Sequence, residues 1–164
     1  QELYLRGAKV KLIHGQGSYS PSEYIPHKIV TTYDQYCQEV IAELQNDYRY
    51  GIFSAAVADY QPKNIFPGKI PSGGALSKIE LTTTQKVICE VRARFPSLGM
   101  ITFKYQGYQM VVANRGEEHF STGTQVAYLV TKDSEPEKAI GKPKIAKAIA
   151  NYLGRVINQK NTFS

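Results

Sequence analysis

Residues 50–58 read YGIFSAAVA, and this stretch decides the fold that the sequence predicts. Its residues are apolar at both odd and even positions, whereas a strand with one face in water would alternate. A short, continuous apolar run is typical of a central strand that is covered on both faces. Prolines and glycines punctuate residues 59–74, which predicts that this strand runs into a long loop.

The chain before this strand alternates between strand and helix patterns. Residues 8–14 (AKVKLIH) alternate apolar and polar side chains, and residues 28–31 form a second, short strand candidate. Thr32 is a suitable N-cap for the helix that follows. The apolar face of that helix repeats at i, i+3, i+4 and i+7 and consists of Cys37, Val40, Ile41 and Leu44.

The chain after the strand repeats this alternation. Residues 78–82 predict a strand or an arm. A helix follows with Thr83 or Thr84 as its cap, and its inward side chains are Val87, Ile88 and Val91. Pro96 stops that helix. Then come strand candidates at 100–105, 108–113 and 125–131, and a last helix after Pro143 with Ile145, Ile149, Leu153 and Val156 on one side.

Strands that alternate with helices predict an α/β layered domain with a mostly parallel sheet. In such sheets, ligands bind beyond the carboxyl ends of the strands. Function is therefore expected in the loops after His14, Ala58, Tyr105 and Ala113.

Length and composition narrow the classes of protein. A chain of 164 residues with 42% hydrophobic residues suits one domain with a substantial core. No run approaches eighteen consecutive apolar residues, and no signal peptide is visible, so we expect a cytoplasmic protein that does not contact a membrane. The two cysteines, Cys37 and Cys89, are expected to be small buried hydrophobes. The three histidines are scattered, and no metal site is predicted.

The net charge of +6 is unevenly distributed, because residues 1–68 carry −1 and residues 69–164 carry +7. A basic half suggests anionic partners such as phosphates. It also fits a solvated basic surface, and that interpretation is favoured for the cluster at 138–147. No G-x-G-x-x-G, G-x-S-x-G or H-E-x-x-H motif occurs, which argues against a dinucleotide dehydrogenase, a serine hydrolase and a zincin.

Three short segments could carry chemistry. Small residues at a strand end, as in SAAVADY at 54–60, let a ligand approach the backbone, with Asp59 projecting from the loop. Lys69 precedes a Ser-Gly-Gly turn and could place an ammonium near a phosphate. The segment VVAN ends in Asn114, whose amide could lie beside a ligand. Each segment alone also fits an ordinary loop cap, a solvent lysine or a chain turn.

The order of these segments resembles the phosphopantothenate–cysteine ligase family, the synthetase half of the bifunctional coenzyme A biosynthesis flavoprotein. The string SAAVADYQP is followed by Lys69 ten residues after Asp59, then by MITFK and VVAN. The segments YLRGAKVKLIHG, KIPSGG, YQMVVAN and YLVTKDSE also look like this family. The resemblance runs from Leu5 to about Leu153 and implies a three-layer Rossmann-like domain with a protruding arm.

The resemblance also implies a reaction in two steps. ATP or CTP, with Mg²⁺ and no prosthetic group, activates the carboxylate of 4′-phosphopantothenate as an acyl-nucleotide, and the amine of cysteine then displaces the nucleotide. Lys69 would be the catalytic lysine. The nucleotide-binding residues would be Phe53, Ser54, Ala55, Asp59, Lys69 and Phe103. Asn114 would be a second catalytic residue, and the substrate would contact Ala55, Ala56 and Asn114.

The sequence departs from the family at two places. The family has a glycine-rich G-G-T strand–loop and an N-x-S-x-G turn that would precede Gln1. It also has a helix of roughly twenty residues where this chain has only residues 105–107. A parallel strand pair needs a dozen or more connecting residues, so we expect missing segments rather than a true deletion, within a single domain at 1–164. The family works as a dimer, and residues 62–78 would be the arm that reaches the neighbouring subunit.

Other interpretations stay open at this point. A catalytically silent homologue could bind a nucleotide or act as a regulatory interaction protein. A Rossmann oxidoreductase is disfavoured because its dinucleotide fingerprint is absent. A nucleic-acid binder is disfavoured because the twelve tyrosines are spread through the chain rather than grouped with lysines. The sequence does not decide between ATP and CTP.

Overall fold

The structure is a computed structural model of the 164-residue chain. It describes residues 1–17, 20–64, 68, 78–103, 108–114, 118 and 124–161, and the description below concerns these residues.

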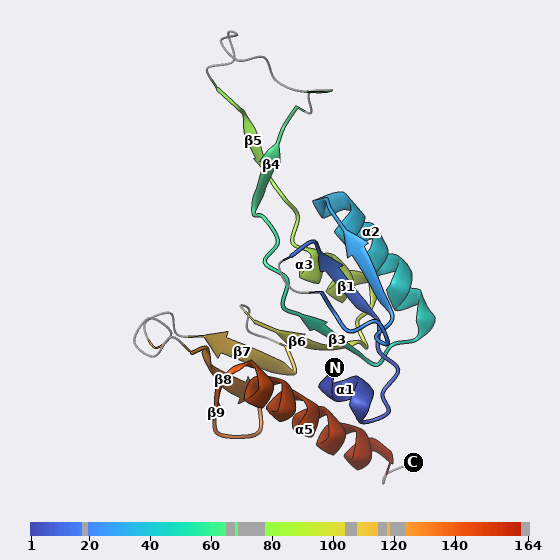
Figure 1. Cartoon of the computed structure of the whole chain (residues 1–164), viewed down its shortest axis with the longest axis vertical. Coiled ribbons are helices and arrows are strands. Elements are labelled where there is room, and N and C mark those ends of the chain that lie inside the picture. Colours follow the sequence, from blue (N-terminus) through green and yellow to red (C-terminus); the bar gives the residue numbers. More distant parts are fainter. Residues whose placement is uncertain are drawn as a thin grey trace.

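A five-stranded sheet forms the centre of the molecule (Figure 1). Its strands, in order across the sheet, are β3 (Tyr50–Phe53), β6 (Gly99–Thr102), β7 (Met110–Asn114), β8 (Val126–Thr131) and β9 (Glu137–Ile140). The pairs β3–β6 and β6–β7 are parallel, whereas β7–β8 and β8–β9 are antiparallel. The predicted α/β class is confirmed, and the described sheet is a mixed one.

Helices cover both faces of this sheet, as a three-layer domain requires. Met100 and Ile101 are neighbours in β6 and both are completely buried, but they belong to different core clusters because successive side chains of a strand point to opposite faces. Ile101 joins the cluster of α5 (Lys142–Asn161), and Met100 joins the cluster of α2 (Tyr33–Glu43) and α3 (Val87–Arg94). The sheet is therefore sandwiched between two helical layers.

The amino-terminal part adds a second, two-stranded sheet. β1 (Leu12–Gly15) and β2 (His27–Val30) pair in parallel, and β1 contacts α2. Thr32 caps α2 as predicted, in a capping box with Gln35. A 3₁₀ turn, η1 (Leu44–Asn46), follows α2. The start of this helix was therefore predicted correctly from the local sequence.

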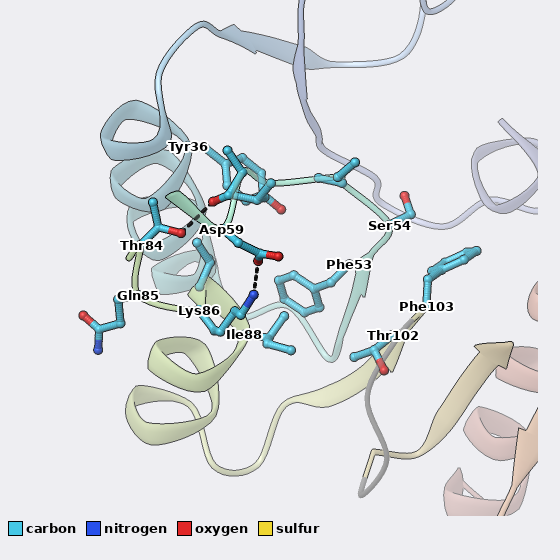
Figure 2. A pocket seen from close by; sticks show the side chains of 15 residues that line it. Tyr36, Phe53, Ser54, Asp59, Thr84, Gln85, Lys86, Ile88, Thr102 and Phe103 are labelled. Carbon is cyan, nitrogen blue, oxygen red and sulfur yellow. Dashed lines mark hydrogen bonds and ion pairs between the residues drawn. The ribbon is translucent and has the colours of Figure 1, made fainter. Parts of the chain in front are cut away.

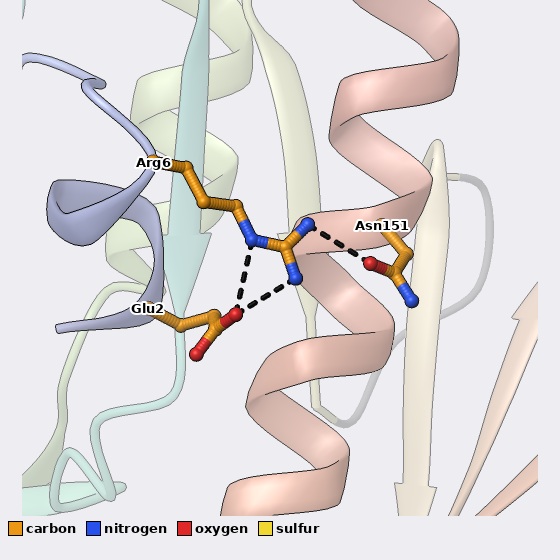
Figure 3. A network of polar contacts seen from close by, with 3 residues as sticks. All are labelled: Glu2, Arg6 and Asn151. Atoms are coloured by element: carbon orange, nitrogen blue, oxygen red, sulfur yellow. Dashed lines mark hydrogen bonds and ion pairs between the residues drawn. The ribbon is translucent and has the colours of Figure 1, made fainter.

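A short first helix, α1 (Glu2–Leu5), lies against α5 (Figure 3). Arg6 donates from Nε and Nη2 to Glu2 Oε1 at 3.0 and 2.7 Å, and from Nη1 to Asn151 Oδ1 at 2.9 Å. These groups are exposed, so each contact contributes on the order of 0.2–1 kcal/mol. The network therefore positions α1 on α5 more than it stabilises the fold.

An antiparallel arm projects away from the domain (Figure 1). It consists of β4 (Tyr60–Pro62) and β5 (Leu81–Thr83). The alternative of an arm for residues 78–82 is thereby confirmed. Its apolar side chains are open to water, with Tyr60, Ile79 and Leu81 about 60% exposed.

Three expectations from the sequence need correction, and one strand of the five-stranded sheet was missed. The run at 50–58 is a strand only over Tyr50–Phe53, and that strand lies at an edge of the described sheet, where Ile52 is 39% exposed. The N-cap of α3 is Lys86 rather than Thr83 or Thr84. Cys89 is exposed, because it lies on the outer side of α3. β9 was not predicted, and its alanine, Ala139, is the one buried residue of the strand.

Strands β6 and β7 are joined by residues 103–109, of which 104–107 lie outside the described residues. Their parallel pairing, Ile101 with Met110 and Thr102 with Val111, is the arrangement for which a longer crossover was expected. That a segment is missing between these two strands stays a prediction.

Candidate functional site

A cavity of about 330 Å³ opens at the carboxyl ends of β3 and β6 (Figure 2). Four parts of the chain line it: residues 53–59 at the end of β3 and beyond, residues 84–88 before and at the start of α3, Thr102 and Phe103 at the end of β6, and Tyr36 of α2. This is the edge of the sheet at which α/β proteins bind ligands. The position of the cavity is therefore the one that the strand order predicts.

Six of the residues singled out in the sequence meet in this cavity. They are Phe53, Ser54, Ala55, Ala56, Asp59 and Phe103. The structure thus brings together side chains from two strand ends, although their individual roles stay predictions. Small side chains over 55–58 leave the space that the cavity occupies.

Two other predicted residues have a different status. Asn114 lies at the end of β7, on the same edge of the sheet, but it does not line the cavity. Its Oδ1 accepts a long hydrogen bond of 3.5 Å from Gln125. Lys69 and the turn at 72–74 lie outside the described residues.

Thr84 links the segment before α3 to the loop after β3 through two hydrogen bonds. Its hydroxyl donates to the carbonyl oxygen of Ala58 at 2.6 Å, and its backbone N–H donates to the carbonyl oxygen of Asp59 at 3.0 Å. Thr84 is only 8% exposed, so these bonds are shielded from water. This is why Thr84 does not cap α3: its hydroxyl is used across the cavity wall instead.

An ion pair between Lys86 and Asp59 crosses the cavity (Figure 2). These two are the only charged side chains among the described residues that line it. Their charges cancel, so the described lining is close to electrically neutral. Sequence reasoning found Asp59 but missed Lys86, because no local pattern distinguishes a lysine at a helix start that reaches a carboxylate 27 residues away.

Two titratable side chains of α2, Tyr36 and Cys37, stay neutral at pH 7. Burial, and to a lesser extent Cys37, raise the pKa of Tyr36, so its hydroxyl stays protonated at neutral pH. Burial and a hydrogen bond to Glu90 raise the pKa of the Cys37 thiol to about 11. Cys37 does not line the cavity, and it is not a thiolate nucleophile at pH 7.

A second cavity of about 400 Å³ lies at the opposite ends of β3 and β6. It is bordered by Tyr50, Gly99 and the end of α5, and it contains none of the predicted site residues. Its greater volume does not make it the better candidate, because it lies at the amino ends of the parallel strands.

Within the described ranges, no group of three or more His, Cys, Asp or Glu side chains could hold a metal ion. None of the helices in this part of the chain combines the length and the apolar composition that a membrane crossing needs.

Comparisons with known proteins agree with the fold and the motifs. A family model described as the DNA/pantothenate metabolism flavoprotein C-terminal domain matches residues 1–106. No curated protein matches the sequence. The solved structure of the DNA/pantothenate metabolism flavoprotein from Streptococcus pneumoniae is similar, with 20% identity and a TM-score of 0.75 over 94% of this chain and 84% of that one.

A second similar structure is the C-terminal domain of the coenzyme A biosynthesis bifunctional protein CoaBC. It shares 22% identity and a TM-score of 0.76 over 96% of this chain and 80% of that one. At these identities the two structures support the fold. The family model covers well over half of the residues, and the chain therefore belongs to the family of the DNA/pantothenate metabolism flavoprotein C-terminal domain.

Proposed function

We propose that this chain is a phosphopantothenate–cysteine ligase domain that acts in coenzyme A biosynthesis. The observation that carries the proposal is the meeting of six motif residues, from two separate strand ends, in one cavity at the carboxyl edge of the sheet. Membership of a family named for pantothenate metabolism supports it. So does the similarity to a domain of a coenzyme A biosynthesis protein.

In this proposal the cavity takes the nucleoside part of ATP or CTP. Its volume is at the lower end of the range for small-molecule sites. Phe53 and the alanines offer apolar surface to a base, and the Asp59 carboxylate accepts a hydrogen bond from a hydroxyl or an amino group. A neutral lining suits an uncharged nucleoside better than a triphosphate, so the phosphates would lie outside the described lining.

Positive charge is then needed where the phosphates lie. We assign this role to Lys69, whose ammonium would neutralise the phosphoryl group under attack. The described lining offers no magnesium site of its own, because its single carboxylate pairs with Lys86. Mg²⁺ would enter with the triphosphate, held by phosphate oxygens and water, and would offset phosphate charge.

The two steps balance as follows in the proposed reaction. A carboxylate oxygen of 4′-phosphopantothenate attacks the α-phosphorus, and the bond to pyrophosphate breaks. The cysteine amine then attacks the acyl carbon, the bond to the nucleoside monophosphate breaks, and the amine loses a proton. Asn114, at the end of β7, would orient the acyl group at this edge of the sheet.

The test is pyrophosphate release by the purified chain with ATP or CTP, in the presence of 4′-phosphopantothenate and Mg²⁺. We expect release that depends on 4′-phosphopantothenate and that is faster with one of the two nucleotides. Addition of cysteine should convert the bound intermediate to phosphopantothenoylcysteine, detected by mass spectrometry. Nucleotide binding without any pyrophosphate release would instead support a silent homologue.

We further propose that two copies of the chain associate through the arm. The arm strands β4 and β5 project from the domain. The apolar side chains of Tyr60 and Leu81 in these strands, and of Ile79 just before β5, are largely exposed. Exposed apolar clusters of this kind are typical of contact surfaces. We expect a solution mass of two chains by light scattering, and of one chain after Tyr60 and Leu81 are changed to Ser. A wild-type mass of one chain at micromolar concentration would contradict the proposal.

A further inference from the structure

The ion pair between Lys86 and Asp59 belongs to the lining of the candidate nucleotide site. Both side chains line the cavity, with exposed fractions of 39% and 50%. Asp59 comes from the loop after β3, and Lys86 comes from the start of α3, so the pair joins the two walls (Figure 2).

The backbone is fixed at both ends of this pair. Two hydrogen bonds from Thr84 hold the carbonyl groups of Ala58 and Asp59. On the other side, the carbonyl oxygen of Lys86 accepts from the N–H of Cys89 at 2.9 Å and from that of Glu90 at 3.3 Å. An ion pair on flexible surface gains little, because ordering two side chains costs entropy. Here the fold already fixes the backbone that carries both side chains.

We propose that Lys86 is a positioning residue: its ammonium holds the Asp59 carboxylate in the orientation that accepts a hydrogen bond from the nucleoside. This inference rests on the proposed function. Nothing in the sequence motifs assigns a role to Lys86.

Lys86→Met removes the ammonium and keeps most of the aliphatic stem. We expect it to raise the dissociation constant of the preferred nucleotide about tenfold, measured by calorimetry. The KM for the nucleotide should rise by a similar factor while kcat changes less than about twofold, because Lys86 acts on binding and not on the reacting atoms. Lys86→Arg should restore most of the affinity.

A double-mutant cycle separates positioning from a general effect on the fold. Asp59→Asn should also weaken binding, and adding Lys86→Met to it should cost less than about twofold more, because the two residues act as a unit. Lys28→Met is the matched control: it breaks a similarly exposed pair with Glu39 that lies outside the cavity. We expect this control to bind nucleotide like the wild type.

Binding of ligands with different numbers of phosphates distinguishes positioning of Asp59 from direct phosphate binding by Lys86. If Lys86 acts through Asp59 on the nucleoside, Lys86→Met weakens the nucleoside, the monophosphate and the triphosphate by the same factor. A loss that grows with each phosphate would overturn the inference, and so would wild-type affinity in Lys86→Met. The inference would also fail if the double variant lost affinity by the product of the factors measured for Lys86→Met and Asp59→Asn alone. A wild-type chain that binds no nucleotide at all would overturn the proposed function instead.

Discussion

Lys69→Ala is expected to lower pyrophosphate release about 10² to 10³-fold, the range seen when one group that stabilises transition-state charge is removed. The reason is electrostatic: in the proposed reaction, a carboxylate must approach an α-phosphate that is itself negatively charged. The described lining of the cavity contributes no net positive charge to offset this repulsion. The loss should appear in kcat, since the charge under attack develops in the transition state.

Lys63→Ala is the control for this prediction. Lys63 directly follows β4 in the arm and pairs with Glu80 at 3.2 Å, with both side chains largely exposed. The variant should release pyrophosphate at the wild-type rate, and thermal unfolding of both variants should match that of the wild type. Near-normal turnover by Lys69→Ala would show that the phosphate charge is balanced by another group. A loss confined to KM would assign Lys69 to ground-state binding.

The sequence predicted the parts of the fold that local chemistry determines. The capping box at Thr32 and the apolar repeat after it specify α2 without help from the rest of the chain. The same holds for α5, in which Ile145, Ile149 and Leu153 are all buried. In each case, the residues that predict the helix lie within about three helical turns of one another.

The position of the cavity could be predicted from the strand ends, but the residues that line it from the segment before α3 could not. Small side chains after a buried run, together with an Asp, indicate a site because parallel strands end at a common edge. Lys86 and Thr84 belong to a different segment, which the long arm brings back to the loop after β3. Only the three-dimensional path of the chain selects these two residues from the many lysines and threonines in the sequence.

The strand at 50–58 shows why an apolar pattern alone is ambiguous. The pattern predicted a strand covered on both faces over nine residues, whereas β3 has four residues and lies at an edge of the described sheet. The remaining apolar residues line the cavity instead of pairing with a neighbour. A ligand site and a sheet interior both call for apolar side chains, so composition cannot separate them.

Ile101→Ala and Ile52→Ala should therefore differ strongly in their effect on stability. The two isoleucines are partners in register on neighbouring strands, but Ile101 is fully buried and Ile52 is 39% exposed. Ile101→Ala leaves a closed void between β6 and α5 and should lower the free energy of unfolding by about 2–5 kcal/mol. Ile52→Ala should cost about 1 kcal/mol, since water already reaches that side chain.

Urea unfolding, followed by circular dichroism, measures the free energy of unfolding of each variant and of the wild type. Because the residue type and the substitution are the same and the two residues are partners in register, the difference between the two values mainly reports how far each side chain is buried. Equal losses would mean that β3 is covered on this face in solution, for instance by a second copy of the chain. Repeating the measurement at several protein concentrations decides that point, because only an interface makes the loss at Ile52 depend on concentration.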